Sequence, residues 1–264
     1  MKNAFRFTFF TLCWGVVFSA QANDNLFTLL RKDSRVKDPV IVEDSMTFAI
    51  ATPKDTSLVK DINGNTYPIV TIGTQVWMAE NLRSSNYSDG TAIPLMADAT
   101  SWATNYNNKT KLPMMCWYDN DQATYTANKC GALYNWYVVS PTTNGGKNLC
   151  PTGWHVPNNA EWTTLIDFLG GETVAGGKMK TTGATQWKSL NMGETNSSGF
   201  SGVPGGLRHY DGGFYDIGYF SYWWSSSEVN PFYAWNRYLF YGGGYVYRGA
   251  YGKDFGYSVR CLRD

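Results

Sequence analysis

The clearest helical pattern of this 264-residue chain begins in Cys150-Pro-Thr-Gly-Trp-His-Val-Pro-Asn-Asn-Ala-Glu-Trp162. Asn158 is a favourable N-cap residue, and Glu161 follows at the spacing of a capping box. Apolar residues then recur at helical spacing until Gly170-Gly171, namely Trp162, Leu165, Ile166 and Leu169. The sequence therefore predicts a helix over about residues 158–169.

The chain on either side of this helix predicts short strands and loops. Asn63-Gly64 is a tight-turn signal, and residues 67–72 alternate before Trp77 as in a buried strand pair, so we expect a folded domain over 61–264. The polar stretch from Ser84 to Asn128 predicts loops. Beyond residue 171, short runs of glycine, serine and aromatic residues predict twisted strands and long loops rather than further helix.

The N-terminus has the pattern of a secretory signal peptide. Lys2 and Arg6 precede an apolar run over 7–18, and small residues before Ala22 predict cleavage there. The run is too short for a transmembrane segment, and Cys13 lacks the small residues that precede a lipoprotein cysteine. We expect residues 1–22 to be a signal peptide, 23–60 a stalk or linker, and the mature protein to be periplasmic, cell-surface or secreted.

The charge balance argues against a nucleic-acid partner. Removing Lys2 and Arg6 from the 22 basic residues leaves 20, against 21 acidic residues. Nucleic-acid binding depends on an excess of basic charge, which the mature chain lacks.

The cysteine count indicates two disulfides. Four cysteines follow Cys13, and an even number in an oxidising compartment is typical of disulfide pairing. Three connectivities are possible, and we favour Cys116 with Cys130 and Cys150 with Cys261, the second of which closes a long loop.

No motif of a known catalytic, nucleotide or metal site is found. Asp119-Asn-Asp121 is the nearest approach to a calcium loop, but Ala123 occupies the next ligand position. There is no CxxC pair, and His155 and His209 lie far apart. His155 has two readings, a general base or a packed histidine bonding the backbone, and we favour the second because no nucleophile accompanies it. We expect no enzyme activity, no cofactor and no metal.

The C-terminal quarter is rich in aromatic residues. Residues 200–264 hold 11 of the 18 tyrosines but a single lysine, Lys253. Tyrosine with small and polar residues is typical of antibody-like contact surfaces, whereas the alternative is that the rings pack inward. We favour a contact surface, because a large aromatic patch usually marks an interaction site. The candidate ligand-binding residues are Phe232, Tyr233, Asn236, Tyr238, Phe240, Tyr245, Tyr247, Tyr251 and Phe255.

A hairpin in this quarter would separate a core side from an aromatic side. A four-residue loop over 241–244 would place Leu239 opposite Val246 on the core side. The other side would then carry Tyr238, Phe240, Tyr245 and Tyr247. The same register puts Arg237 opposite Arg248, an unfavourable like-charge pair, so a three-residue loop that mixes the faces stays open.

Six motifs resemble, in order, those of the Fibrobacter succinogenes major paralogous domain, a family of bacterial exported proteins. One is the stretch from Cys150 to Trp162. The others are Asp61-x-x-Gly64-Asn65-x-Tyr67, Trp77-Met-Ala-Glu-Asn-Leu82, Gly131-Ala-Leu-Tyr-Asn-Trp136, Tyr222-Trp-Trp-Ser-Ser-Ser-Glu228 and Ser258-Val-Arg-Cys-Leu-Arg-Asp264. The resemblance covers about residues 61–264.

Val156-Pro-x-x-Ala-Glu-Trp162 with a Val-Arg ending also resembles formylglycine-generating enzymes, which share a C-type-lectin-like fold. The resemblance implies an α+β domain with few helices, small twisted antiparallel sheets and long loops. It also implies that the chain ends meet in a small sheet and that Cys150 bridges to Cys261. The Glu-Pro-Asn and Gln-Pro-Asp motifs of calcium-dependent lectins and the active cysteine pair of the enzymes are missing.

The resemblance raises one further hypothesis, that of a diversity-generating retroelement target. Such elements rewrite adenines in the 3′ end of some C-type-lectin-like genes, and a rewritten Asn codon yields residues of the kind found at 229–233, 249–252 and 254–255. The diversified contacts would be Tyr238, Phe240, Tyr245, Tyr247 and Tyr251. Ordinary drift would give the same residues.

The sequence thus predicts an exported, non-catalytic protein that binds a protein or glycan. A passive cell-surface or matrix component is the alternative, and an enzyme of the formylglycine-generating type is less favoured.

Overall fold

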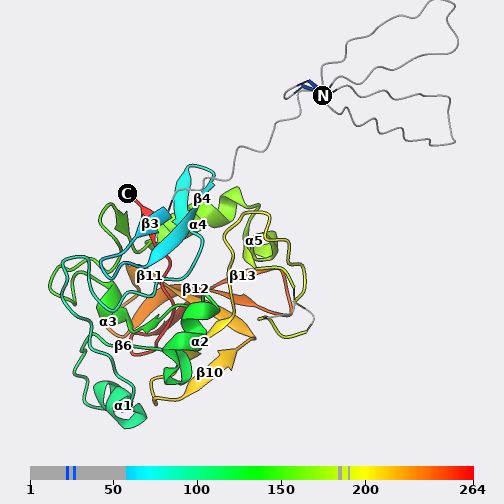
Figure 1. Ribbon diagram of the computed structural model, residues 1–264. Coiled ribbons are helices and arrows are strands. Elements are labelled where there is room, and N and C mark those ends of the chain that lie inside the picture. The colour runs from blue at the N-terminus through cyan, green and yellow to red at the C-terminus, as the bar shows by residue number, and fades with distance from the viewer. Residues whose placement is uncertain (1–21, 24–25, 28–57, 184–185, 190) are drawn as a thin grey trace, which may run out of the picture. The chain divides into compact units, whose positions relative to one another are not determined.

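The computed structural model describes residues 22–23, 26–27, 58–183, 186–189 and 191–264, and the chain divides into two units, Met1–Thr52 and Pro53–Asp264. In the first unit, strands β1 (Ala22–Asn23) and β2 (Leu26–Phe27) pair antiparallel. Nearly all of the predicted signal peptide (1–22) and most of the predicted stalk (23–60) lie outside the described residues. The second unit, shown in Figure 1, carries everything discussed below.

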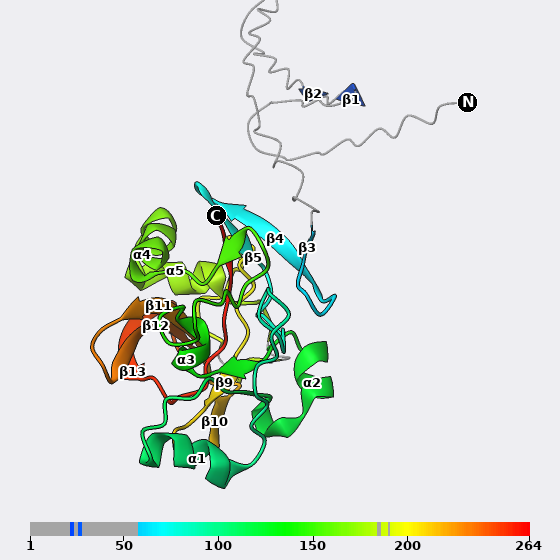
Figure 2. The ribbon, with the colours of Figure 1, turned by 90° about the vertical axis from the view of Figure 1, so that its left-hand side faces the viewer.

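A five-stranded sheet brings the end of the second unit to its beginning. Its order is β3-β4-β5-β14-β8, with β3 (Leu58–Lys60), β4 (Thr66–Ile72), β5 (Gln75–Met78), β14 (Leu262–Arg263) and β8 (Trp154–His155). Figure 2 shows the C-terminus beside these strands. The strand pair predicted around residues 67–77 is confirmed, with Tyr67 and Ile69 buried on one side.

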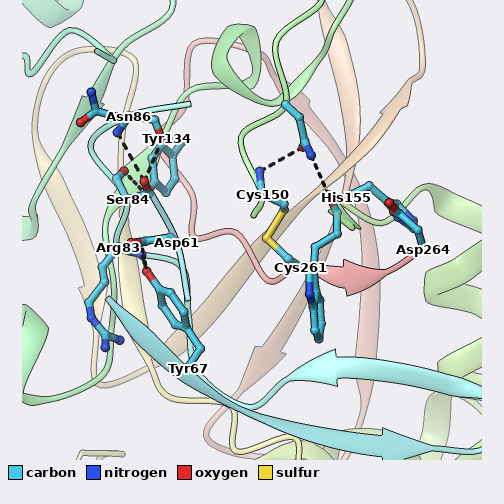
Figure 3. The surroundings of a disulfide bond; sticks show 12 residues. Asp61, Tyr67, Arg83, Ser84, Asn86, Tyr134, Cys150, His155, Cys261 and Asp264 are labelled. Carbon is cyan, nitrogen blue, oxygen red and sulfur yellow. Dashed lines mark hydrogen bonds and ion pairs between the residues drawn. A yellow bond between two sulfur atoms is a disulfide. The ribbon is translucent and has the colours of Figure 1, made fainter. Parts of the chain in front are cut away.

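The predicted bond between Cys150 and Cys261 is present (Figure 3). Its partners are 111 residues apart, a loop length for which cross-linking stabilises a fold by about 4–5 kcal/mol in the chain-entropy account. The bond joins the loop before β8 to the segment that leads into β14.

The second predicted disulfide, Cys116 with Cys130, is wrong, because within the described part of the chain both thiols are free and buried. Their surroundings differ. Cys116 lies in β6 (Met115–Cys116) beside Arg208, whereas the Cys130 sulfur contacts the carbonyl oxygen of Asn128 at 3.7 Å. Burial raises the pKa of each thiol to about 12, so both stay protonated.

The predicted helix is confirmed as α4 (Asn159–Phe168), and its capping box joins Asn158 and Glu161 as expected. The loop prediction for residues 84–128 is wrong in part, because α1 (Ala99–Asn107), the 3-10 turn η1 (Tyr118–Asn120) and α2 (Gln122–Ala127) form there. Helix α1 begins at Asp98, which caps it by accepting from the Ser101 amide at 2.8 Å. Two more helices are α3 (Trp136–Val139) and α5 (Glu172–Met179).

Helix α5 contradicts the expectation of strands and loops after residue 171. It contains Gly176 and Gly177, which ordinarily disfavour helix by about 1 kcal/mol each relative to alanine. A Cβ on Gly176 would lie 2.3 Å from the carbonyl oxygen of Tyr245, and one on Gly177 would lie 2.2 Å from that of Gly193. The glycines are therefore required for close packing, which overrides their low helix propensity.

Three smaller sheets complete the unit. Strand β6 pairs with β7 (Leu133–Tyr134), and β9 (Gly205–Arg208) pairs with β10 (Phe214–Ile217). The third sheet has the order β11 (Phe220–Glu228), β12 (Tyr233–Phe240), β13 (Val246–Gly252). The result is the predicted α+β fold with few helices and small antiparallel sheets. No helix among the described residues has the length and apolar character that a membrane crossing requires.

Candidate ligand-binding surface

The β12–β13 hairpin of the three-stranded sheet has the register expected for a four-residue loop, and the three-residue alternative is not the one observed. Leu239 pairs with Val246, Tyr238 with Tyr247, and Arg237 with Arg248. Because neighbouring residues on a strand point to opposite sides, this register fixes two different faces.

One face packs on helices. Trp223, Leu239 and Val246 are at most 2% exposed and share a hydrophobic cluster with residues of α4 and α5. Figures 1 and 2 show both helices lying over this sheet. We call it the helix-facing side.

The opposite face carries a continuous set of aromatic rings, which we call the aromatic face. Its members on the strands and just before β13 are Phe220, Tyr222, Trp224, Tyr238, Phe240, Tyr245, Tyr247 and Tyr251. Tyr238 and Tyr247 stack at 4.9 Å between ring centroids and an interplanar angle of 11°. Neighbouring pairs contact at 4.9–6.5 Å, so the rings form one connected surface.

Exposure of these rings changes along the face. Trp224 is fully buried and Tyr222 nearly so, because Tyr257 packs on both, 4.9 Å from the Tyr222 ring and 4.4 Å from the Trp224 ring. At the other end, Tyr245 is 47% exposed and Tyr247 37%. The face therefore has an anchored end in the core and an open end at the β12–β13 turn.

Polar groups accompany the rings at the anchored end. The Tyr222 hydroxyl donates to Asp216 Oδ2 at 2.8 Å, and burial, reinforced by this carboxylate, raises the pKa of Tyr222 far above its ordinary value. Burial also raises the pKa of Tyr238. Both hydroxyls thus stay protonated and able to donate hydrogen bonds at any physiological pH.

The open end is held in place by α5 and by one buried lysine. The Nζ atom of Lys180 lies 2.8 Å from the carbonyl oxygens of Met192 and Gly243, and 3.3 and 3.4 Å from those of Phe240 and Tyr241. These bonds, with the close contact of Gly176 on Tyr245, fix the turn that presents Tyr245. The aromatic face is therefore supported from beneath.

Most of the predicted contact residues come together. Tyr238, Phe240, Tyr245, Tyr247 and Tyr251 lie on the aromatic face, and Phe255 joins them through Tyr251 at 5.9 Å between ring centroids. Three others are placed differently.

Asn236 lies on the same side of the sheet as the aromatic face, but it is 0% exposed and therefore offers no contact surface. Phe232 and Tyr233 are exposed at 67% and 46%, but they lie at the β11–β12 turn and at the start of β12, away from the Tyr245 end. The structure does not bring these two into the ring contacts described above.

The sequence prediction missed several aromatic residues that extend the surface. Phe220 and Tyr222 belong to β11 and could have been found from the alternation Phe220-Ser-Tyr-Trp-Trp224. Phe255 also contacts His209 at 4.9 Å and Tyr210 at 5.5 Å between ring centroids. No sequence signal links residues 209–210 to the hairpin, because only the fold brings them together.

His155 binds two carboxylates rather than the backbone. Its Nδ1 lies 2.6 Å from Asp264 Oδ1 and its Nε2 lies 3.0 Å from Glu161 Oε1. Figure 3 shows His155 and Asp264 side by side near the disulfide. Because Glu161 also caps α4, this arrangement ties β8, the helix and the chain end together. Among the described residues, no group of three His, Cys, Asp or Glu side chains is placed to hold a metal ion.

Comparison with known proteins gives one match. A family model described as the Fibrobacter succinogenes major domain matches residues 70–263. No curated protein and no solved structure matches the chain.

Proposed function

This chain belongs to the Fibrobacter succinogenes major domain family, and we propose that it is an exported, non-catalytic binding protein whose aromatic face contacts a protein or glycan ligand. The observation that carries the proposal is the contrast between the sheet's two sides. Around Leu239 and Val246 the helix-facing side packs on α4 and α5, whereas connected rings stay exposed at Tyr245 and Tyr247 on the other side. Burying large apolar rings is favourable, so a surface that keeps them in water marks an interaction site.

The chemistry of the face suits binding rather than catalysis. It offers ring surfaces and hydroxyls that donate hydrogen bonds, and the Asp216 carboxylate beside it is already bonded to Tyr222. Rigid amphipathic rings supply contact area at a small cost in conformational entropy. Sugar rings and apolar protein side chains both pack on such surfaces.

The direct test is a binding screen with matched variants. Labelled protein would be applied to a printed glycan array and to a displayed peptide library. Ligands that bind the wild type and the Phe168→Ala variant but not the Tyr245→Ala/Tyr247→Ala double variant support the proposal. Phe168 is the control because it is also an exposed aromatic, at 63%, but lies on α4 on the helix-facing side. Ligands that bind the double variant as well as the wild type would overturn it.

Export is the second part of the proposal. A disulfide such as Cys150–Cys261 forms in an oxidising compartment, which supports a location outside the cytosol. N-terminal sequencing of protein recovered from the cell envelope or the medium tests this part. A mature N-terminus at Asn23 is expected, and an unprocessed protein confined to the cytosol would contradict it.

Diversification of the surface is the third part. The open end of the aromatic face falls within residues 229–255, the region in which the retroelement hypothesis expects substitutions. Sequencing the 3′ end of the gene and its flanks in many sibling cultures is the test. Substitutions clustered at adenines beside a reverse-transcriptase gene and a near-copy template support diversification, whereas an invariant region with ordinary flanks rules it out and leaves a fixed surface.

A further inference from the structure

Arg237 is a buried arginine on the helix-facing side of the three-stranded sheet. Its residue is 1% exposed. Nη1 donates to the carbonyl oxygen of Asn236 at 3.1 Å, and Nη2 donates to Asn159 Oδ1 at 3.0 Å on α4. Among the described residues, the Nε–H has no hydrogen-bond partner. Leaving a buried charged donor unpaired is costly, so this group requires an explanation.

Two other buried arginines show what the fold ordinarily does with such groups. Arg208 and Arg260 are both 0% exposed. Arg208 donates from Nε, Nη1 and Nη2 to the carbonyl oxygens of Gly212, Met96 and Ala97. Arg260 likewise uses all three nitrogens, on Asn81 Oδ1 and on carbonyl oxygens such as that of Phe200. Arg237 differs from both in keeping one nitrogen unused.

A second guanidinium stands beside Arg237. Arg248 is its register partner on β13, and directly opposite side chains on one face lie about 5 Å apart at Cβ. Burial and the charge of Arg248 lower the pKa of Arg237 to about 10. Within the described part of the chain, neither arginine has a carboxylate within ion-pair distance. Glu172 on α5 partly opposes the effect of Arg248 on the pKa of Arg237 without forming an ion pair, so the repulsion between the two arginines is only partly compensated.

The solvent-facing member of this pair is Arg248, because Arg237 Nε is closed off from solvent. Arg248 is exposed on β13, an edge strand, with its guanidinium 4.9 Å above the Trp235 ring. Thr163 of α4 is also exposed and lies within 3.4 Å of Arg237 Nη2. The pair therefore combines a donor that is closed off from solvent with an exposed guanidinium group.

We propose that Arg237 and Arg248 form an oxyanion-binding site, which accepts a carboxylate, sulfate or phosphate group between the two guanidinium groups. On binding, the Arg248 side chain moves off the Trp235 ring and opens the way to Arg237. One oxygen of the group then accepts from Arg237 Nε–H, and the others accept from the planar fork of Arg248. This binding supplies the missing partner and neutralises the like-charge pair at once. The site lies on the side of the sheet opposite the aromatic face and does not depend on the function proposed for that face.

The test is titration of the wild-type protein with inorganic phosphate and with glucuronate, against chloride at equal ionic strength and against neutral glucose. The side-chain Nε–H signals of arginine in a ¹⁵N–¹H spectrum report each guanidinium separately. A saturable shift of the Arg237 and Arg248 signals with phosphate or glucuronate, but not with chloride or glucose, supports the site. Saturation with phosphate indicates a free ion as ligand, and saturation with glucuronate alone indicates a carboxylate carried on a sugar.

Two variants complete the test. Arg248→Gln should weaken binding by about tenfold or more, since it removes charge-assisted hydrogen bonds. Arg263→Gln is the matched control and should stay within about twofold, because Arg263 is an exposed arginine stacked 5.1 Å above Trp154 without a second arginine opposite. No saturable shift at Arg237, or equal binding by Arg248→Gln, overturns the proposal. Arg248 is exposed, so the Arg248→Gln variant should fold, and a change in its affinity can be attributed to the lost guanidinium group.

Discussion

The two sides of the β11-β12-β13 sheet are built from alternate residues of the same strands, yet they differ in burial and in role. Leu239 and Val246 are sealed against α4 and α5, whereas Tyr247, one residue beyond Val246, is 37% exposed. Substitutions on a sealed side disturb packing on both sheet and helices, whereas substitutions on an open side disturb little. The strand thus separates residues that stabilise the fold from residues that are free to serve recognition.

The strongest expected effect comes from emptying the sealed side. Trp223→Ala should lower the free energy of unfolding by about 3–5 kcal/mol, because it leaves a large cavity among close-packed rings. Trp223 is 0% exposed, and its ring centroid lies 5.4 Å from that of Phe200 and 6.2 Å from that of Trp162. Denaturant unfolding measures the change, and Trp223→Phe should lose clearly less. A loss below about 1 kcal/mol would mean that this side is not the structural one.

The contact between α5 and the hairpin turn should give the next largest effect. Gly176→Ala ordinarily favours a helix by about 1 kcal/mol. Here the new Cβ would meet the carbonyl oxygen of Tyr245 at 2.3 Å, so we expect a net loss of about 1–3 kcal/mol. Thermal unfolding measures it, with Val174→Ala on the exposed side of α5 as the control. A stabilised Gly176→Ala protein would show that the turn does not rest on the helix.

Lys180 donates hydrogen bonds to the backbone of the β12–β13 turn, and its titration should make the free energy of unfolding depend on pH. Burial lowers its pKa to about 8 in the folded protein, against about 10.4 in an unfolded chain. Between these values the unfolded chain binds more protons, so the free energy of unfolding should rise with pH, by at most about 1.4 kcal/mol per unit. The wild type should show this rise relative to Lys180→Met between about pH 8 and 10. Parallel pH profiles for the two proteins would contradict the prediction.

The sequence limited the register of the β12–β13 hairpin to two alternatives but did not reveal which polar residues are buried. Of the two loop lengths left open, the structure has the four-residue loop, in which Leu239 pairs with Val246. Asn236 and Arg237 gave no sign of being buried. Arg237 contacts Asn159 and Thr163 of α4, a segment that is distant in the sequence, and no local pattern reports such packing.

The helices missed by the sequence show a second limit. Helix α1 buries only Trp102 and Asn105, so it has no apolar stripe to be detected. Helix α5 contains two glycines that allow close packing against residues 193 and 245. By contrast, α4 was predicted because its cap and its buried stripe are both local features. Sequence patterns therefore predicted the helix that local interactions stabilise, whereas the helices that depend on packing against distant segments were missed.

The smallest expected effect on stability is also the one that best separates the two sides. Tyr245→Ala should change the free energy of unfolding by no more than about 0.5 kcal/mol, because nearly half of the side chain is in water. Tyr247→Ala should lose about 1 kcal/mol, since it also removes the stacking on Tyr238. Denaturant unfolding of both variants alongside Trp223→Ala measures the contrast. Losses above about 2 kcal/mol at Tyr245 would place its ring in the core, and the open end of the aromatic face would then be structural rather than a contact surface.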